Sequence, residues 1–184
     1  MKNAPGPDGT PDGATEFSGK PYSYIKFPND GKLDTRESIT ILAWVKNKGK
    51  SGPVVHYNER GWGVHLWVED RYRLSVRFVR RNGKFTKKLI SPRSKGPFYR
   101  AWNFVGAAYN GRTGIATLFV NGNIVARIRI GRVRLATRRN IRVGAIIGDR
   151  RYFKGAIACV HIFRKALNAY QIRKKAKICF KPSK

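Results

Sequence analysis

Short segments in which apolar and polar residues alternate run through most of this chain. A period of two is typical of β-strands, because successive side chains of a strand point to opposite faces of the sheet. The segments with this pattern cover residues 38–45, 61–68, 72–79, 102–109, 115–120, 124–130 and 155–163. A helical pattern occurs only over residues 168–177. Many short strands without helices between them predict an all-β protein, either a sandwich or a barrel.

The residues between two of these segments predict a specific turn. Asn121 and Gly122 separate the segment 115–120 from the segment 124–130. An Asn-Gly pair favours a type I′ turn, because both central residues of that turn need positive φ angles. We therefore expect a β-hairpin with a two-residue turn here.

The length of the chain fits a single β-rich domain. The chain has 184 residues, of which 41% are hydrophobic, and this is enough for a core. Residues 1–13 contain three prolines and three glycines, so we expect a flexible leader there. The predicted domain covers residues 14–180, and residues 181–184 form a tail. The opening residues lack the pattern of a signal peptide, so a secreted origin implies that this peptide has been removed.

The polar residues of the chain are mostly cationic. There are 39 Lys and Arg residues against 10 Asp and Glu residues, which gives a net charge of +29 at pH 7. Such a charge favours association with anionic partners, namely nucleic acid, sulfated polysaccharide or an anionic membrane surface. No apolar run approaches the roughly 18–20 residues of a membrane-spanning helix.

The cationic residues form groups that are candidate binding sites for polyanions. Arginine forks and lysine ammonium groups are the side chains that bind sulfate and phosphate. The candidate groups are Arg71, Arg73 and Arg77; Arg80, Arg81, Lys84, Lys87 and Lys88; Arg127, Arg129, Arg132 and Arg134; and Arg138, Arg139 and Arg142. For each group the alternative is a solvated charged face without a particular ligand.

The chain contains two cysteines, Cys159 and Cys179. They are too few for a zinc site without other ligands, and the three histidines, His56, His65 and His161, lack ligand spacing. We therefore expect no metal site. The residues leave two alternatives for the cysteines: a pair of free buried thiols, or one disulfide that indicates an oxidising compartment.

Four segments share sequence patterns with a known family. Residues 101–122 resemble the pattern W-x-x-V-A-x-x-Y-D-G followed by L-Y-V-D-G, and residues 146–168 resemble Y-F-x-G-x-I-D-D-V-x-I-Y-x-R-A-L. Residues 17–19 and 39–45 match two opening blocks of the same family. In these segments the chain resembles laminin-G-like domains of the concanavalin A-like superfamily. The resemblance implies a two-sheet antiparallel jelly-roll sandwich, used as an extracellular binding module, to which the pattern at 168–177 adds one short C-terminal helix.

The resemblance also bears on the cysteines and on calcium. Some laminin-G-like domains carry a C-terminal disulfide at the positions of Cys159 and Cys179, which implies that these residues are joined. Ser18 and Ala158 stand where the family often has aspartates, which leaves few hard oxygen ligands for calcium besides Asp149. We therefore expect no cofactor, with calcium as the alternative.

No arrangement of residues in the sequence predicts catalysis. Glycosidases on related sandwiches use closely spaced carboxylates in a Glu-x-Asp-x-Glu arrangement, which is absent here. Glu69 and Asp70 are adjacent in an expected turn, where solvated carboxylates are usual. No combination of serine, histidine and acid can be assigned as a triad. We therefore expect that the protein is not an enzyme.

Charge and resemblance together predict a secreted, non-catalytic module that binds heparin-like sulfated glycans or other polyanions. One alternative is a structural or engineered scaffold that assembles with anionic partners through its charge. A second alternative is a non-specific nucleic-acid binder, although the chain has no recognised reading motif. The sequence does not predict the oligomeric state.

A further hypothesis concerns Trp67. If the even-numbered residues of segments 61–68 and 72–79 face the core, a three-residue loop pairs residue 68 with residue 72 and sets Trp67 opposite Arg73 on the outer face. An exposed indole beside a guanidinium can stack on a sugar ring while Arg73 binds an acidic group. The alternative is that Trp67 packs beneath a neighbouring loop.

Overall fold

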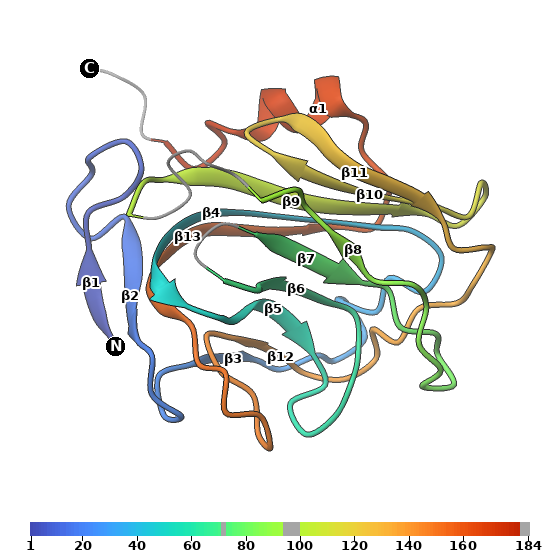
Figure 1. Cartoon of the computed structure of the whole chain (residues 1–184), viewed down its shortest axis with the longest axis horizontal. Helices are drawn as coiled ribbons and strands as arrows, with labels where there is room; N and C mark the ends of the chain where they lie inside the picture. The colour runs from blue at the N-terminus through green and yellow to red at the C-terminus, as the bar shows by residue number, and fades with distance from the viewer. Residues whose placement is uncertain (71–72, 94–99, 181–184) are drawn as a thin grey trace.

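The computed structural model describes residues 1–70, 73–93 and 100–180, which form two antiparallel β-sheets packed face to face (Figure 1). The seven-stranded sheet has the order β1 (Lys2–Ala4), β2 (Ala14–Ser18), β13 (Lys154–Phe163), β4 (Ile39–Lys50), β9 (Asn103–Asn110), β10 (Ile115–Val120) and β11 (Asn123–Arg129). The six-stranded sheet has the order β3 (Ile25–Phe27), β12 (Ile141–Val143), β5 (Gly52–Tyr57), β6 (His65–Val68), β7 (Leu74–Arg77) and β8 (Leu89–Ile90). This is the predicted jelly-roll sandwich.

Apolar residues of the alternating segments fill the space between the two sheets. On and beside β6 and β7 the core residues are Val64, Leu66, Val68, Leu74, Val76 and Phe78, all of them fully buried. The prediction that even-numbered residues face the core is therefore confirmed for these strands. It is wrong for Trp62, which is 40% exposed, because β6 begins only at His65 and Trp62 lies in the loop before it.

The predicted hairpin between β10 and β11 is confirmed. Asn121 and Gly122 have φ angles of 52° and 76°, and Val120 pairs with Asn123 on either side of them. The positive φ angles are those that the type I′ turn requires.

The N-terminal residues do not form a wholly flexible leader. Strand β1 pairs with β2 in antiparallel register, with Ala4 opposite Ala14. The turn between them is closed by backbone hydrogen bonds in which Gly6 and Gly13 donate to the carbonyl of Thr10, at 2.9 and 3.1 Å. The expected leader is therefore wrong for Lys2–Ala4. Its prolines and glycines form the turn of a hairpin, which adds an edge strand to the seven-stranded sheet.

The register between β6 and β7 differs from the prediction by two residues. Val68 pairs with Leu74 and Trp67 pairs with Ser75, so Arg73 lies in the loop instead of opposite Trp67. The predicted parity is correct, since an odd number of loop residues keeps the apolar side chains of both strands on the core face. The loop itself is longer than the three residues expected.

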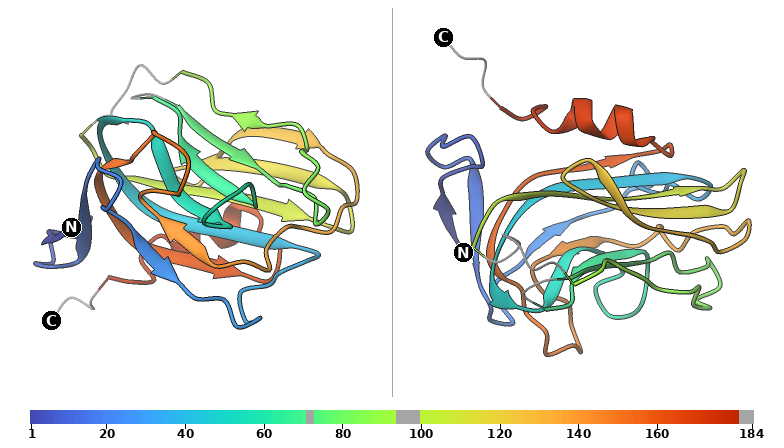
Figure 2. Two further views of the ribbon diagram at one scale, coloured as in Figure 1. Left: turned by 90° about the horizontal axis from the view of Figure 1, so that it is seen from below. Right: turned by 45° about the horizontal axis from the view of Figure 1, so that its top comes forward.

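A C-terminal helix, α1 (Ala169–Lys175), lies on the outer face of the seven-stranded sheet (Figure 2). Its N-cap is Asn168, whose side chain accepts from the backbone of Gln171, while the Gln171 side chain accepts from the Asn168 backbone. The helix is held to the sheet by a small apolar cluster that includes Leu42, Phe104, Phe119, Leu167 and Ile172. No helix in the described part of the chain has the length and apolar character needed to cross a membrane.

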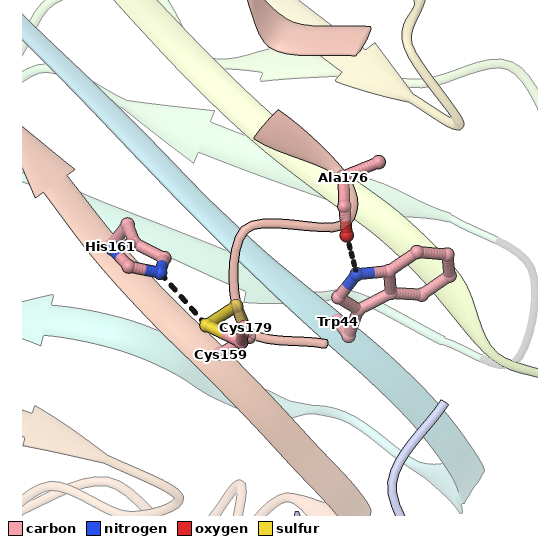
Figure 3. The surroundings of a disulfide bond; sticks show 5 residues. All are labelled: Trp44, Cys159, His161, Ala176 and Cys179. Atoms are coloured by element: carbon pink, nitrogen blue, oxygen red, sulfur yellow. Dashed lines mark hydrogen bonds between the residues drawn. A yellow bond between two sulfur atoms is a disulfide. The ribbon is translucent and has the colours of Figure 1, made fainter. Parts of the chain in front are cut away.

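The segment after α1 is tied to β13 by a disulfide between Cys159 and Cys179, which are 20 residues apart (Figure 3). This confirms the pairing that the family resemblance implies. Beside it, the Trp44 indole donates a hydrogen bond to the carbonyl of Ala176 (2.8 Å), and His161 Nε2 lies 3.0 Å from Cys179 Sγ. The segment from Ala176 to Cys179 is therefore held by covalent and polar contacts in addition to the packing of the helix.

Candidate functional site

A layer of aromatic and imidazole rings covers the outer face of the six-stranded sheet. His56 on β5, and His65 and Trp67 on β6, alternate with core residues and so point away from the seven-stranded sheet. The rings of His56 and His65 stack with their centroids 5.1 Å apart, and the Trp67 ring lies 5.7 Å from that of His56. All three side chains are buried and form the floor of the candidate site.

Burial keeps both histidines in the neutral form, and hydrogen bonds orient their rings. The Trp67 indole donates to His56 Nδ1 (3.0 Å), so His56 carries its proton on Nε2, which donates to the carbonyl of Gly61 (2.9 Å). His65 Nδ1 donates to the carbonyl of Gly63 (2.8 Å). Burial lowers the pKa of His56 to about 4 and the pKa of His65 to about 3. The floor is therefore uncharged at neutral pH.

Two aromatic side chains above this floor are exposed. Trp62, in the loop between β5 and β6, is 40% exposed, and Phe85, in the loop between β7 and β8, is 52% exposed. Their rings meet edge to face with centroids 6.0 Å apart. The Trp62 ring also lies 5.6 Å from His56 and 5.3 Å from His65. The Trp62 indole is therefore supported by the buried layer and still accessible to solvent.

Guanidinium groups lie over two rings of this face, those of Phe85 and Trp67. The Arg77 guanidinium is 4.8 Å from the centre of the Phe85 ring, and that of Arg151 is 4.4 Å from the Trp67 ring. Arg151 donates to both carboxylate oxygens of Asp149, at 3.0 and 2.6 Å, and this bond lowers the pKa of Asp149. Exposed aromatic rings beside guanidinium groups can bind a ligand that has an apolar ring face and an anionic substituent. We call Trp62, Phe85, Arg77 and Arg151 the aromatic–arginine site.

The hypothesis that Trp67 forms an exposed platform is wrong. Its side chain is 2% exposed, because Arg151 lies over its ring and Trp62 packs beside it with ring centroids 6.1 Å apart. The alternative, in which Trp67 packs beneath a neighbouring loop, is correct. The exposed indole of this layer belongs to Trp62, which packs beside Trp67 and Phe85.

Five of the predicted polyanion-binding residues form ion pairs with acidic side chains. The pairs are Arg73 with Asp70 (2.8 Å), Arg81 with Asp34 (2.9 Å), Lys88 with Glu69 (3.0 Å), Arg134 with Glu37 (3.5 Å) and Arg142 with Glu59 (3.2 Å). A surface role for Arg142 is wrong, because it is 7% exposed and its guanidinium lies over the Tyr24 ring, 3.8 Å from the ring centre. Hydrogen bonding by Arg81 holds the pKa of Asp34 well below its usual range.

Eight other predicted cations are exposed, and no ion pair involves them within the described part of the chain. They are Arg80, Lys84, Lys87, Arg127, Arg129, Arg132, Arg138 and Arg139. They are spread over several parts of the surface: Arg127 and Arg129 lie on the edge strand β11, and Arg138 and Arg139 precede β12. Arg77 joins the aromatic–arginine site, and Arg71 lies outside the described residues.

The arrangement of potential metal ligands does not favour a metal site. Among residues 1–70, 73–93 and 100–180, Cys159, His161 and Cys179 bring three ligand atoms within 4.8 Å of one another. The two sulfur atoms are joined in the disulfide, so they cannot act as thiolate ligands. Asp149, the carboxylate considered for calcium, is paired with Arg151.

A comparison with known protein families agrees with the observed fold. Residues 18–173 match the Laminin_G_3 family, described as the concanavalin A-like lectin/glucanases superfamily. The chain belongs to this family. The resemblance inferred from the sequence motifs is thereby confirmed. A comparison of this laminin-G-like domain with curated protein sequences finds no match.

Solved structures share the fold of this laminin-G-like domain at low sequence identity. The binding domain of Paraclostridial mosquitocidal protein 1 aligns with a TM-score of 0.74 and 15% identity, over 94% of this chain and 44% of that chain. The binding domain of botulinum neurotoxin serotype G aligns with a TM-score of 0.72 and 17% identity, over 92% and 44%. A predicted carbohydrate-binding protein from Bacteroides ovatus aligns with a TM-score of 0.69 and 18% identity, over 88% and 46%. This chain therefore spans less than half of each structure, and the likeness shows the fold alone.

Sequence reasoning missed most of the aromatic–arginine site of this laminin-G-like domain. It assigned Arg77 but not Trp62, Phe85 or Arg151. One local signal was present for Trp62, which stands between two glycines. A Cβ atom on Gly63 would lie 2.3 Å from the Tyr57 carbonyl oxygen, so only glycine allows the tight turn that presents Trp62 to solvent. No comparable signal marks Arg151, which reaches the site from the loop before β13.

Proposed function

We propose that this laminin-G-like domain is a non-catalytic extracellular module that binds acidic carbohydrate at the aromatic–arginine site. The observation that carries the proposal is the exposed Trp62 indole, which is supported by buried rings and packs beside Phe85 and Trp67, the rings over which the guanidinium groups of Arg77 and Arg151 lie. The apolar face of a sugar ring stacks on an indole or phenyl ring, and a sulfate or carboxylate on that sugar binds a guanidinium. The aromatic rings of the site thus bind the apolar face of an acidic sugar, and its guanidinium groups bind the acidic substituent.

The surrounding charge supports an anionic ligand. The net charge of the chain is +29, so the potential around the site attracts polyanions and raises their rate of association. The family includes lectins, and a predicted carbohydrate-binding protein shares the fold. The disulfide supports an extracellular location, because such bonds persist in oxidising compartments.

The carboxyl groups support a role without catalysis. A glycosidase needs a general acid with a raised pKa close to a second carboxylate. The pKa lies below its ordinary value in each of five carboxyl groups of the described residues, Asp30, Asp34, Glu59, Glu69 and Asp149. These groups remain ionised at neutral pH and are paired with cations, which does not suit an acid catalyst.

The test of this function replaces Trp62 and compares defined ligands. We expect Trp62→Ala to weaken binding of a heparin hexasaccharide by about five- to tenfold, the effect of losing about 1–1.4 kcal/mol of stacking. Isothermal titration calorimetry at one ionic strength measures the affinity. The matched control is Tyr170→Ala, which removes another exposed aromatic ring beside a lysine, on α1 at the opposite sheet, and should change the affinity less than twofold.

Competing ligands separate the proposed function from its alternatives. Single-stranded DNA is the second candidate ligand, because exposed aromatic rings beside arginines also stack on bases. A neutral hexasaccharide of equal length tests the need for acidic groups. Preference for DNA over heparin would replace the proposal by nucleic-acid binding. Affinities that follow charge density alone, with Trp62→Ala and Tyr170→Ala equal, would favour a charge-driven scaffold.

A further inference from the structure

A polar hollow of about 570 Å³ lies between three loops of the domain. The loops follow β3, connect β5 to β6, and precede β12. The hollow is lined by Asn29, Asn58, Glu59, Arg60, Arg138, Arg139 and Asn140. The loop between β5 and β6, which supplies three of these residues, is the turquoise loop at the bottom of Figure 1.

Asparagine side chains and backbone bonds hold the walls of this hollow in place. Asn140 Oδ1 accepts from the Asn29 backbone N–H (3.0 Å), and the Asn29 side chain donates to the carbonyls of Thr137 (2.8 Å) and Arg139 (3.2 Å). The Asn58 backbone N–H donates to the carbonyl of Asn140 (2.9 Å). These bonds connect all three loops. The hollow is therefore preorganised and does not have to form when a ligand binds.

The charge inside the hollow is almost entirely positive and uncompensated. Its one carboxylate, Glu59, is already paired with Lys26 (3.2 Å) and with the buried Arg142 (3.2 Å). The three arginines that line the hollow are exposed, and none of them forms an ion pair with any residue that the structure describes. Three unpaired guanidinium groups in one preformed hollow are a suitable site for an oxyanion, because arginine binds such groups through paired N–H donors.

We propose that this hollow is a second subsite, which binds a sulfate or phosphate ester carried by the same acidic carbohydrate chain as the aromatic–arginine site. This inference rests on the proposed function. Arg60 and Trp62 are two residues apart on one loop, so their Cα atoms are at most about 7 Å apart. A chain that stacks on Trp62 can therefore continue over this loop and place its next anionic substituent among Arg60, Arg138 and Arg139. The preferred ligand is a multiply esterified oligosaccharide that contacts both subsites.

The test removes the three charges of the hollow and varies the ligand length. The variant is Arg60→Gln/Arg138→Gln/Arg139→Gln, and its matched control, Arg127→Gln/Arg129→Gln/Arg132→Gln, removes three exposed cations near the β11 edge. Calorimetry of the wild-type protein and both variants, each with heparin disaccharide and hexasaccharide, gives six affinities. For the hollow variant we expect hexasaccharide affinity to fall about tenfold or more, because the linked second contact is lost. Disaccharide affinity, which depends on the Trp62 site, should fall less than threefold.

The outcomes distinguish this subsite from the function on which it rests. The control variant should weaken both ligands by the same small factor, because it changes only the general potential. Equal losses in the hollow and control variants, or a hollow variant that weakens both ligand lengths equally, would overturn the second subsite. Such a result would leave the proposed function intact if Trp62→Ala still weakens binding. Thermal unfolding of each variant shows whether it is folded, and a misfolded variant is replaced by its arginine-to-lysine counterpart, in which the paired N–H donors are lost and the charge remains.

Discussion

At the scale of single residues, the two hydrogen bonds of His56 determine which form of its imidazole the buried layer can hold. His56 accepts from one N–H group, that of Trp67, and donates to one carbonyl, that of Gly61. Only the neutral imidazole with its proton on Nε2 satisfies both contacts. A proton on Nδ1 would point at the indole N–H and would also place a charge in a buried site. The Trp67–His56 pair is thus stable only while the imidazole is neutral.

This chemistry predicts a loss of stability in mild acid. The unfolded histidines have a pKa near 6.5, whereas the folded ones have pKa values of about 4 and about 3. Below about pH 6.5 the unfolded chain binds protons that the native state excludes, so the free energy of unfolding falls as the pH decreases, by up to about 1.4 kcal/mol per pH unit for each histidine. Urea unfolding followed by circular dichroism between about pH 7.5 and about pH 5 measures the slope.

The control for this prediction is His56→Gln. The glutamine amide oxygen can accept from the Trp67 indole and its amide group can donate, but it does not titrate. We expect a shallower slope in this variant than in the wild-type protein. A wild-type stability that stays constant over the same pH range would contradict the prediction.

At the scale of elements, α1 depends on contacts made by residues around it. A helix of seven residues is too short to be stable in isolation, so its stability comes from packing, capping and the crosslink that follows it. Ile172 is buried against the seven-stranded sheet, Asn168 caps the first turn, and the disulfide and the Trp44–Ala176 hydrogen bond secure the segment beyond it. Each of these four contacts uses at least one residue outside the helix.

Removal of the disulfide should therefore destabilise the domain. A crosslink between residues 20 positions apart restricts the unfolded chain by an amount that corresponds to about 3 kcal/mol. We expect Cys159→Ser/Cys179→Ser to lower the free energy of unfolding by about this amount and to speed amide exchange in residues 168–180.

Thiol labelling checks the same bond in the native protein. Denatured but unreduced protein should give no labelled thiol, and reduced protein should give two. Two labelled thiols without reduction would contradict the disulfide. If the wild-type protein and the double-serine variant have equal free energies of unfolding, the disulfide contributes nothing to stability.

At the scale of the whole molecule, most of the positive charge is uncompensated. The chain has 39 Lys and Arg residues and 10 acidic residues, so ion pairs can neutralise only a minority of the cations. Three acidic residues, Glu59, Glu69 and Asp149, each pair with a cation beside the candidate face or the hollow. The remaining cations create a long-range positive potential around the domain.

Binding of a sulfated chain should therefore be strongly dependent on salt. Four proposed contacts, from Arg60, Arg77, Arg138 and Arg139, would release counterions from the ligand, whereas the charge of Arg151 is already balanced by Asp149. If each contributes as a phosphate contact to a single-stranded polyanion does, the affinity falls about fiftyfold between about 50 and about 200 mM salt. Calorimetry with heparin hexasaccharide at several salt concentrations gives the slope, which should be shallower in the hollow variant. An affinity independent of salt would contradict an electrostatic mode of binding.

The sequence by itself determined the fold class, the hairpin and the core faces of the central strands. These features depend on local patterns: alternation places Leu66 and Val76 on one face, and Asn121-Gly122 specifies its turn through backbone φ preferences. The family motifs also indicated the pairing of Cys159 with Cys179, which the structure confirms.

Only the tertiary structure decided which aromatic ring is exposed and which cations are unpaired. Alternation correctly assigned Trp67 to the outer face, but an outer face is exposed only where no other segment covers it, and Arg151 covers Trp67 from a loop 84 positions further along the chain. In the same way Arg142 is buried because Glu59 and Tyr24 reach it from distant segments. The exposure of a side chain and its ion pairing depend on residues that are remote in sequence. A local pattern of residues therefore cannot predict them.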